Sequence, residues 1–311
     1  MLGCWLRTGV MFIFMTALLM LVGGIVGYFL GGYWMIGTAV MLAISLLICF
    51  VSYYKSKDMA LKANHVKIIF RSEQPRLYDM VQELADKAGL PMPEVGIVDS
   101  PLPNAFATGR NPENAAVVAT TGILDLLPDD ELRGVLAHEM SHIKNRDILV
   151  MGIASALAIV ISYAARITWY LAFFGSGNNR DNNRGIIILI ALAAQILVPF
   201  AALLIQMGVS RSREYLADES GGILINDPRA LARALDHLDK GSAPIVTSYT
   251  LEGQDPRTNP TAAIMTNSNY AHMWISNPLK KEGFWQSLFS THPPMQDRID
   301  RLNKLADKMG L

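Results

Sequence analysis

The segment LAHEMSHIKNRD at residues 136–147 contains two histidines four positions apart, with a glutamate directly after the first. Residues four apart on an α-helix project from one face, so His138 and His142 could both bind one Zn²⁺ at about 2.0–2.1 Å. Glu139 would lean over the same metal. It could take a proton from a zinc-bound water as that water attacks a carbonyl, and pass the proton to the departing amine. This chemistry is the hydrolysis of an amide bond.

Long apolar stretches predict that this motif lies at a membrane. The 311-residue chain is 51% hydrophobic, and no charged residue occurs from Thr8 to Tyr54. About 20 apolar residues cross about 30 Å of hydrocarbon. We therefore expect four spans, near 9–30 and 34–53 and within 148–174 and 185–210. Arg166 interrupts the third, which leaves open whether that helix crosses the membrane fully.

Lysines and arginines lie mainly on one side of these spans. They are Lys55, Lys57, Lys62, Lys67, Arg71, Lys144, Arg146, Arg211 and Arg213, against Arg180 and Arg184 on the other side. The excess places the polar parts in the cytoplasm. The expected organisation is a transmembrane hairpin over 1–55, the first part of a catalytic domain over 56–147, a second hairpin over 148–209, and the second part of that domain over 210–311. No cleavage site follows the first span, which predicts an uncleaved anchor.

The polar parts predict both helices and strands. The spacing of apolar residues and the start and stop signals indicate helices over 75–89, 227–241 and 292–310, and strands over 93–100 and 115–124. A further helix is expected to begin at Pro128 and to run through the histidines into the third span. Residues 210–222 are expected to continue the fourth span as far as two glycines. Residues 242–285 are expected to form a long, mobile loop.

A hydrolytic zinc site generally takes three protein ligands and leaves the fourth position to water. The downstream candidates are Glu214, Asp218, Glu219, His237, His272 and His292. His142 lies about six residues before the third span, and Glu214 about four after the fourth, so both would lie roughly 6–10 Å from the same membrane face. Two antiparallel spans joined by a short loop are natural neighbours. We therefore expect Glu214 as the third ligand, with His237 and His272 as alternatives.

Carboxylates near these ligands could orient them. Asp218 lies one turn after Glu214 and could accept the free N–H of a ligating histidine. The alternative is an exposed carboxylate, or a partner for Arg211 or Arg213. Asn145 and Asp147 need no special explanation near a membrane surface. The two cysteines, Cys4 and Cys49, lie in or beside the first hairpin and predict neither a disulfide framework nor a thiolate metal site.

Four segments, in order, resemble the HtpX-type membrane zinc metalloproteases, which are relatives of the CAAX prenyl proteases. They are NAFATG (104–109), LAHEMSH (136–142), SRSREYLAD (210–218) and THPPMQDRI (291–299). The resemblance covers nearly the whole chain. It implies one Zn²⁺ per chain held by His138, His142 and Glu214, with Glu139 as the catalytic base. The fold class is then a mainly α membrane protein, with four transmembrane helices and a cytoplasmic zincin-like α+β metalloprotease domain that carries a small β-sheet.

The resemblance also implies roles for residues whose types alone do not reveal them. His292 would stabilise the oxyanion, and Arg298 would lie near the site, with an ion pair within the terminal helix as the alternative. The substrate-binding edge would comprise Asn104, Ala105 and the strand at 115–121, including Val117, Val118 and Ala119. An exposed strand can capture an extended peptide by adding it to the sheet, which predicts broad specificity.

The function implied is cleavage of misfolded or damaged membrane proteins at the cytoplasmic face of a bacterial plasma (inner) membrane. Prenylated substrates are not expected, because four spans cannot enclose the large chamber of the prenyl proteases. The first rival is a membrane-anchored scaffold with a structural zinc site, but such a site would fill its fourth position with protein and needs no Glu139.

Two further classes fit the sequence poorly. A metal transporter would carry ionisable residues within its spans, and apart from Arg166 these spans have none. Net charge is zero, and no basic stripe with interleaved aromatics occurs, so nucleic acid is not expected as a partner.

Overall fold

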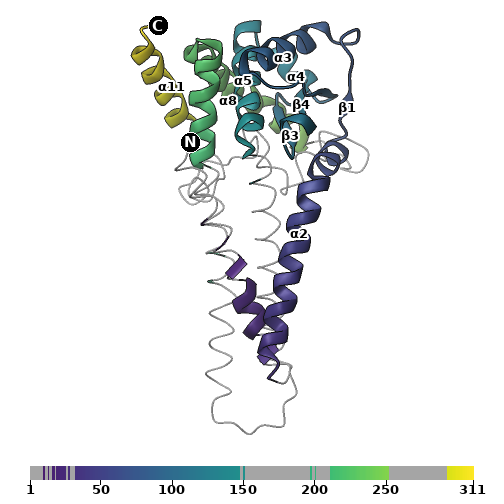
Figure 1. Ribbon diagram of the computed structural model, residues 1–311. Helices are drawn as coiled ribbons and strands as arrows, with labels where there is room; N and C mark the ends of the chain where they lie inside the picture. The colour runs from purple at the N-terminus through teal and green to yellow at the C-terminus, as the bar shows by residue number, and fades with distance from the viewer. Residues whose placement is uncertain are drawn as a thin grey trace. The chain divides into compact units, whose positions relative to one another are not determined.

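The computed structural model describes residues 32–147, 211–251 and 293–311, together with residues 150, 197 and 200 and scattered positions between 10 and 28. Two compact units divide the chain: Met1–Tyr54 with Val150–Val209, and Lys55–Leu149 with Ser210–Leu311. Figure 1 labels the elements of both. No helix among the described residues is both long and apolar enough to cross a membrane. The third and fourth expected spans lie almost entirely outside those residues.

The helix expected to end at residue 53 is longer than predicted. It is α2 (Trp34–Ala63), a 30-residue helix. Residues 54–63 contain neither glycine nor proline, so nothing in the sequence stops the helix at the end of the apolar stretch. The chain then turns at His65, where φ is 51°.

The second unit contains a mixed sheet of four strands. They are β1 (Lys67–Ile68), β2 (Glu94–Val98), β3 (Ala105–Gly109) and β4 (Ala115–Thr120), with the short 3₁₀ helix η1 (Pro112–Asn114) between the last two. Their order is β1-β2-β4-β3, with β2 and β4 parallel and both outer pairs antiparallel. The strand expected over 115–124 ends earlier, because the Thr120 side chain accepts a hydrogen bond from the N–H of Ile123 and caps α4 (Thr121–Leu126).

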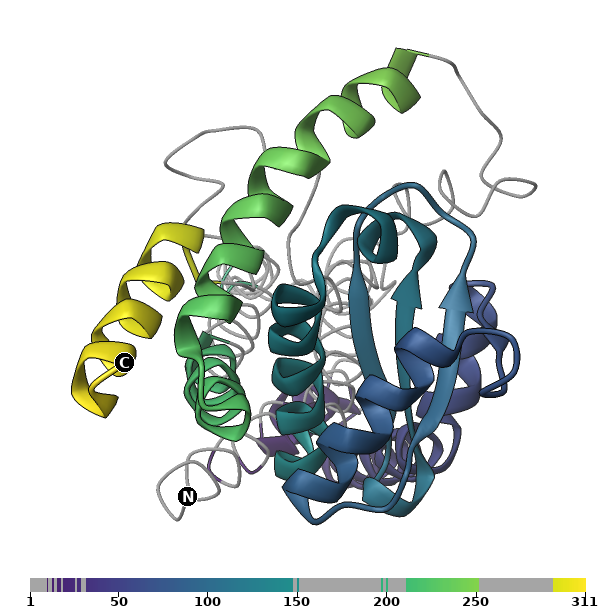
Figure 2. The same cartoon turned by 90° about the horizontal axis from the view of Figure 1, so that it is seen from above.

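Helices lie in layers beside this sheet (Figure 2). They are α3 (Pro75–Ala88), α5 (Asp129–Asn145), α8 (Pro228–Leu251) and α11 (Met295–Met309). Helix α5 contacts β3 on one side and α8 on the other, and α11 packs against α8. The main core joins buried apolar residues of α3, β4, α5 and α8, among them Leu84, Val117, Leu136 and Leu235. Burial of each such side chain contributes about 1.5–3 kcal/mol. This core holds α5 firmly between the sheet and α8.

Helix α5 ends before the point predicted from the sequence. Asp129, Asp130 and Glu131 occupy its first turn, where acidic side chains interact favourably with the helix dipole. It was expected to continue into the third span, but it stops at Asn145. Arg146 takes the left-handed conformation with φ 55°, and its N–H bonds back to the carbonyls of the last turn. This turn redirects the chain immediately after the two histidines.

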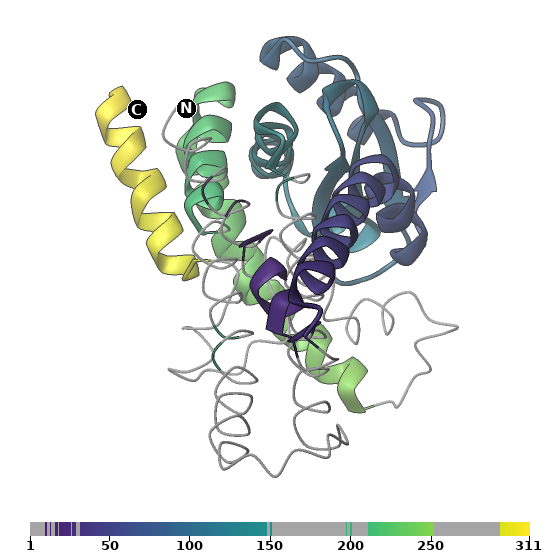
Figure 3. The ribbon, with the colours of Figure 1, turned by 60° about the horizontal axis from the view of Figure 1, so that its bottom comes forward.

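Two other helices pass the glycines expected to end them. Residues 211–225 are helical through Gly221 and Gly222. Gly221 faces α5 so closely that a Cβ at this position would lie 2.8 Å from the backbone N of His138. Glycine there permits close packing on α5. Similarly, α8 continues past Gly241 to Leu251 (Figure 3). The loop expected over 242–285 therefore begins at least ten residues later, and its remainder lies outside the described residues.

Candidate metal centre

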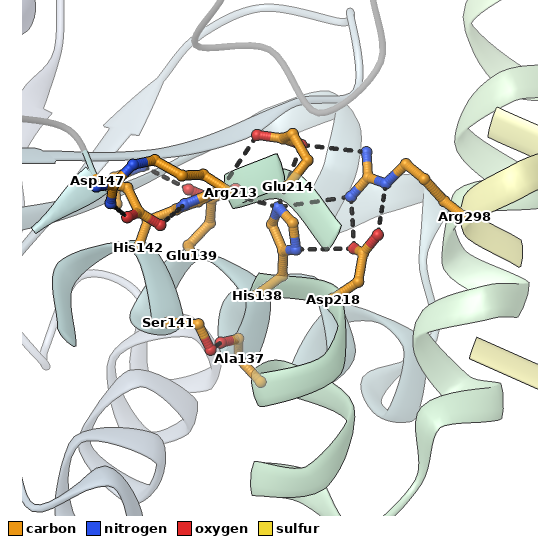
Figure 4. A network of polar contacts seen from close by, with 11 residues as sticks. Ala137, His138, Glu139, Ser141, His142, Asp147, Arg213, Glu214, Asp218 and Arg298 are labelled. Carbon is orange, nitrogen blue, oxygen red and sulfur yellow. Dashed lines mark hydrogen bonds and ion pairs between the residues drawn. The ribbon is translucent and has the colours of Figure 1, made fainter. Parts of the chain in front are cut away.

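Helix α5 and the 211–225 helix bring the three expected ligands together (Figure 4). The Nε2 atoms of His138 and His142 are 3.1 Å apart. The Glu214 carboxylate oxygens lie 3.7 Å from Nε2 of His138 and 3.5 Å from Nε2 of His142. Two ligand atoms bound at about 2.0–2.1 Å to one tetrahedral metal are about 3.3 Å apart. The spacing therefore fits a single metal ion.

The other ring nitrogens show which atoms face this centre. Nδ1 of His138 lies 3.0 Å from Oδ1 of Asp218, and Nδ1 of His142 lies 2.9 Å from Oδ2 of Asp147. An ionised carboxylate can only accept a hydrogen bond, so these contacts favour the tautomer with the hydrogen on Nδ1 and a lone pair on Nε2. Two lone pairs only 3.1 Å apart repel each other unless a proton or a metal ion lies between them. The donor set thus fits a divalent metal such as Zn²⁺.

The buried charges around the centre favour the same ion. Four carboxylates and two guanidiniums are each less than a tenth exposed: Glu139, Asp147, Glu214, Asp218, Arg213 and Arg298. When all six are ionised, four negative and two positive charges leave a net charge of −2. An uncompensated buried charge is costly. One divalent cation would neutralise this cluster.

Burial and neighbouring charges shift the pKa values of His138 and His142 in opposite directions. Burial lowers the pKa of His138, because it disfavours the charged form of the ring. Burial also disfavours the charged form of His142, but its hydrogen bond with Asp147 and the negative charges of Glu214 and Glu139 outweigh this and raise its pKa to about 9. In the absence of a metal, a proton therefore occupies the His142 side of the centre.

Glu139 is buried beside the centre and is fixed by the sheet. The N–H of Ala107 in β3 donates to its Oε2 at 2.7 Å. Burial raises the pKa of Glu139 to about 7, although the positive charge of His142 and the Ala107 hydrogen bond act against this rise. A base with a pKa near the working pH can both take and return a proton. The strand anchors one carboxylate oxygen and leaves the other for proton transfer.

Arg298 reaches the centre from α11 and is fully buried. Its Nε and Nη2 donate to the two oxygens of Asp218 at 2.8 and 2.7 Å, and its Nη1 lies 3.5 Å from Glu214. The alternative of an ion pair within the terminal helix is therefore wrong. Burial opposes ionisation of Asp218, but the charge and hydrogen bonds of Arg298 lower its pKa to about 2. Asp218 stays ionised and can hold the ring of His138.

The sheet order corrects the expected substrate-binding edge. Strand β4, which contains Val117, Val118 and Ala119, pairs with β2 on one side and β3 on the other, so it cannot accept a further strand. The expectation of an exposed edge at 115–121 is wrong. The edge strand beside α5 is β3, which begins at Ala105 directly after Asn104. Because Ala107 donates away from β4 to Glu139, alternation along the strand points the backbone groups of Ala105 and Ala107 away from β4, toward the unpaired side of a strand that is buried.

Two expected residues fall elsewhere. His292 lies outside the described residues. His237, an alternative ligand, contacts Glu131 near the start of α5, with Nδ1 2.6 Å from Oε2. It does not join the group formed by His138, His142 and Glu214.

The sequence interpretation missed the roles of Asp147 and Arg213. Asp147 contacts His142, and Arg213 forms an ion pair with the other oxygen of Asp147. A separation of five residues does not place two side chains on one helix face. Contact becomes possible only through the left-handed turn at Arg146, and an arginine gives no sequence signal for such a turn.

Residues 71–306 match the profile of peptidase family M48. The chain is 44% identical over 316 residues to the Protease HtpX homolog of Thermococcus sibiricus, covering 100% of this chain and 99% of that protein. It is 42% identical over 313 residues to the Protease HtpX homolog of Pyrococcus furiosus, covering 99% and 98%. It is 43% identical over 296 residues to that of Persephonella marina, covering 95% of each.

A solved structure shows the same fold. The crystal structure of S. mikatae Ste24p matches with a TM-score of 0.53 and 18% identity, over 97% of this chain and 67% of that one. The resemblance to HtpX-type proteases is thereby confirmed. With its helix-rich architecture, small mixed sheet and full-length relatives, the chain belongs to peptidase family M48.

Proposed function

We propose that the chain is an integral-membrane, zinc-dependent endopeptidase that cleaves misfolded or damaged membrane proteins at the cytoplasmic face of the plasma membrane. One observation carries this proposal: Glu139, with one carboxylate oxygen anchored on an edge strand, lies beside a buried His138–His142–Glu214 group whose spacing suits one metal ion. A base next to a three-ligand centre is the arrangement of a hydrolytic site.

The chemistry divides between the ion and the side chains. A bound Zn²⁺ supplies Lewis acidity, which polarises a peptide carbonyl and makes water acidic enough to react near neutral pH. Glu139 receives the proton of the attacking water and delivers it to the amine that leaves. Anchoring by the Ala107 N–H keeps the carboxylate from rotating away between these two transfers. His292 is proposed as the donor that stabilises the oxyanion.

Substrate binding is proposed at β3. An extended peptide would add to the outward edge of this strand, using the main-chain groups of Ala105 and the carbonyl of Ala107, with Asn104 at its start. The N–H of Ala107 already holds Glu139, so a peptide paired here would pass directly beside the base. Recognition of main-chain atoms accepts many sequences, as removal of damaged proteins requires.

The membrane organisation is also a proposal. Apolar stretches over 1–55 and 148–209 would form two hairpins, and the parts over 56–147 and 210–311 would form the catalytic domain in the cytoplasm. The lysines and arginines that flank the expected spans support this orientation. Labelling of single introduced cysteines from either side of sealed vesicles tests it, and labelling of residue 240 from the outer side would contradict it.

Metal analysis and proteolysis of the purified protein in detergent test the catalytic proposal. We expect the wild type to hold one zinc per chain and to cleave an unfolded reporter protein. Glu139→Gln should keep the zinc and lose about 10²–10⁴-fold in activity, whereas Glu214→Ala should lose the zinc. His237→Ala is the matched control and should keep both, because His237 pairs with Glu131. Full activity of Glu139→Gln would remove that residue from the mechanism.

A further inference from the structure

Each histidine of the candidate centre is backed by a carboxylate and then by an arginine. On one side the order is His138, Asp218, Arg298, with contacts of 3.0 Å and then 2.7 and 2.8 Å. On the other side it is His142, Asp147, Arg213, with a contact of 2.9 Å followed by the ion pair between Asp147 and Arg213. Figure 4 shows both series of contacts on opposite sides of Glu214.

The ion pair of the second series is enclosed by protein. Asp147 and Arg213 are each only 2% exposed. A buried ion pair of this kind contributes little net stability compared with apolar residues of similar volume. Its contact with a ligand nitrogen suggests that the pair serves the centre rather than the fold.

We propose that Asp147 and Arg213 are positioning residues that hold His142 in its metal-binding tautomer. Asp147 accepts the proton of Nδ1 through Oδ2, which leaves the Nε2 lone pair directed at the centre. Arg213 occupies Oδ1, so that the Asp147 carboxylate is held in one orientation with Oδ2 facing His142. This inference rests on the proposed metal centre, and it adds a function to two residues that the ligand pattern does not include.

The arginine makes the proposal testable by a substitution that preserves shape. In Asp147→Asn, one carboxylate oxygen becomes an NH₂ group. Arg213 can only donate, so it would keep the remaining oxygen, and the NH₂ would face Nδ1 of His142. That nitrogen must then accept, and the ring proton moves to Nε2, where it blocks the metal. The expected result is zinc affinity about 10–100-fold weaker than in the wild type.

Removal of Arg213 should reverse part of this loss. In Asp147→Asn/Arg213→Met, the asparagine is free to turn its oxygen toward His142 and restore the binding tautomer. We expect the double variant to bind zinc more tightly than Asp147→Asn, although Arg213→Met alone should bind more weakly than the wild type. A purely structural pair predicts the opposite sign, with the double variant as weak as Asp147→Asn or weaker.

The measurement is the zinc dissociation constant of the metal-free protein in detergent, determined by competition with a chelator, with thermal melts to verify folding. Asp130→Asn is the control: it changes an aspartate–arginine contact at the start of α5, Asp130 to Arg233 at 2.7 Å, away from the ligands. Its zinc affinity should equal that of the wild type.

Wild-type affinity in Asp147→Asn, or no rescue in the double variant, would overturn the positioning role while leaving the metal centre intact. Absence of zinc binding by the wild type would overturn the centre itself and this inference with it. If Asp147→Asn does not fold, Arg213→Lys and Arg213→Met decide. The lysine can still donate to Oδ1 and should retain more affinity than the methionine, and equal affinity of the two would count against the proposal.

Discussion

The two sides of the candidate centre use the same residue types but are assembled differently. On the His138 side, Asp218 and Arg298 come from separate helices, and Arg298 lies 160 residues from the histidine. On the His142 side, Asp147 is only five residues away and reaches the ring through one turn. The side chain of His138 is 1% exposed and that of His142 is 13% exposed. One side depends on the packing of three helices, and the other depends on a local turn together with Arg213 of the 211–225 helix.

The difference shows how a metal centre can have one ligand fixed by burial and another that stays accessible. Distant segments that pack together enclose one ligand completely. A local turn can orient the other ligand without covering it, so that side stays more accessible. Disruption of either side should lower stability, because each carboxylate is buried against an arginine, and disruption of the His138 side, which joins three helices, should lower it more.

The largest effect is expected from Arg298→Met. This change leaves the buried Asp218 carboxylate without its two-point partner, and loss of one member of a buried ion pair destabilises a protein by about 3–5 kcal/mol. Thermal denaturation of the metal-free protein measures it. Arg301→Met is the control on the same helix, because Arg301 stacks over the Tyr215 ring at 3.8 Å and should cost less than about 1 kcal/mol. Equal losses of stability in Arg298→Met and Arg301→Met would show that the buried contact with Asp218 has no special importance.

A second prediction concerns pH, with Glu139 as the buried group between the two sides. Burial raises its pKa to about 7 in the folded, metal-free protein, from the ordinary value of 4.5 for a glutamate. Between those pH values the unfolded chain has already released this proton and the folded one has not. The folded state therefore loses stability as pH rises through this window.

Glu139→Gln removes this pH dependence. The stability of the variant relative to the wild type should increase from about pH 4.5 to pH 7 and then level off, by roughly 3 kcal/mol at most. Thermal melts of both metal-free proteins at several pH values measure the difference. A difference independent of pH would show that burial does not shift this carboxyl.

Gly221→Ala tests the packing on the His138 side. A methyl group there would lie 2.8 Å from the backbone N of His138, so the 211–225 helix must move away from α5. We expect a loss of about 1–3 kcal/mol in stability and weaker zinc binding, since Glu214 belongs to the displaced helix. Gly222→Ala is the neighbouring control, because its Cβ would meet Pro228 rather than α5. Unchanged zinc affinity in Gly221→Ala would be the contrary result.

The smallest effect is expected from Arg146→Gly on the His142 side. Arg146 has φ 55°, and a left-handed conformation costs a non-glycine residue about 1–2 kcal/mol. Part of the gain is offset because glycine loses more backbone entropy on folding, so stability should rise by about 0.5–1 kcal/mol with unchanged zinc affinity. Asn226→Gly, at φ 54°, should gain less because asparagine tolerates this conformation. A loss of stability in Arg146→Gly would show that the arginine side chain matters more than its backbone.

The sequence allowed prediction of the parts of the site that depend on local spacing. Helical periodicity placed His138 and His142 on one face, and the apolar stretches on either side suggested that Glu214 would return to the same place. The structure brings these three together. The spacing of apolar residues also predicted helix α3, and Gly89, the predicted stop, is its left-handed C-cap.

What could not be predicted depends on contacts between distant segments or on backbone strain. Strand order decides that β3 rather than β4 forms the edge, and alternating apolar residues do not encode it. The stop of α5 at Arg146 lacks the glycine that usually signals a left-handed turn. Without that stop, Asp147 could not be placed beside His142. In the sequence, Gly221 likewise reads as the end of a helix. In the structure this glycine lies within a helix and lets the backbone of α5 approach closely.

The position of Arg298 in the chain has a consequence for biosynthesis. A ribosome that has completed the codon for Asp218 has made both histidines, Glu139 and Glu214, but must add 80 more residues before this guanidinium exists. Until α11 docks, the Asp218 carboxylate lacks the positive charge that keeps it ionised when buried. The order of synthesis thus delays full assembly of the proteolytic centre until nearly the whole polypeptide has been translated.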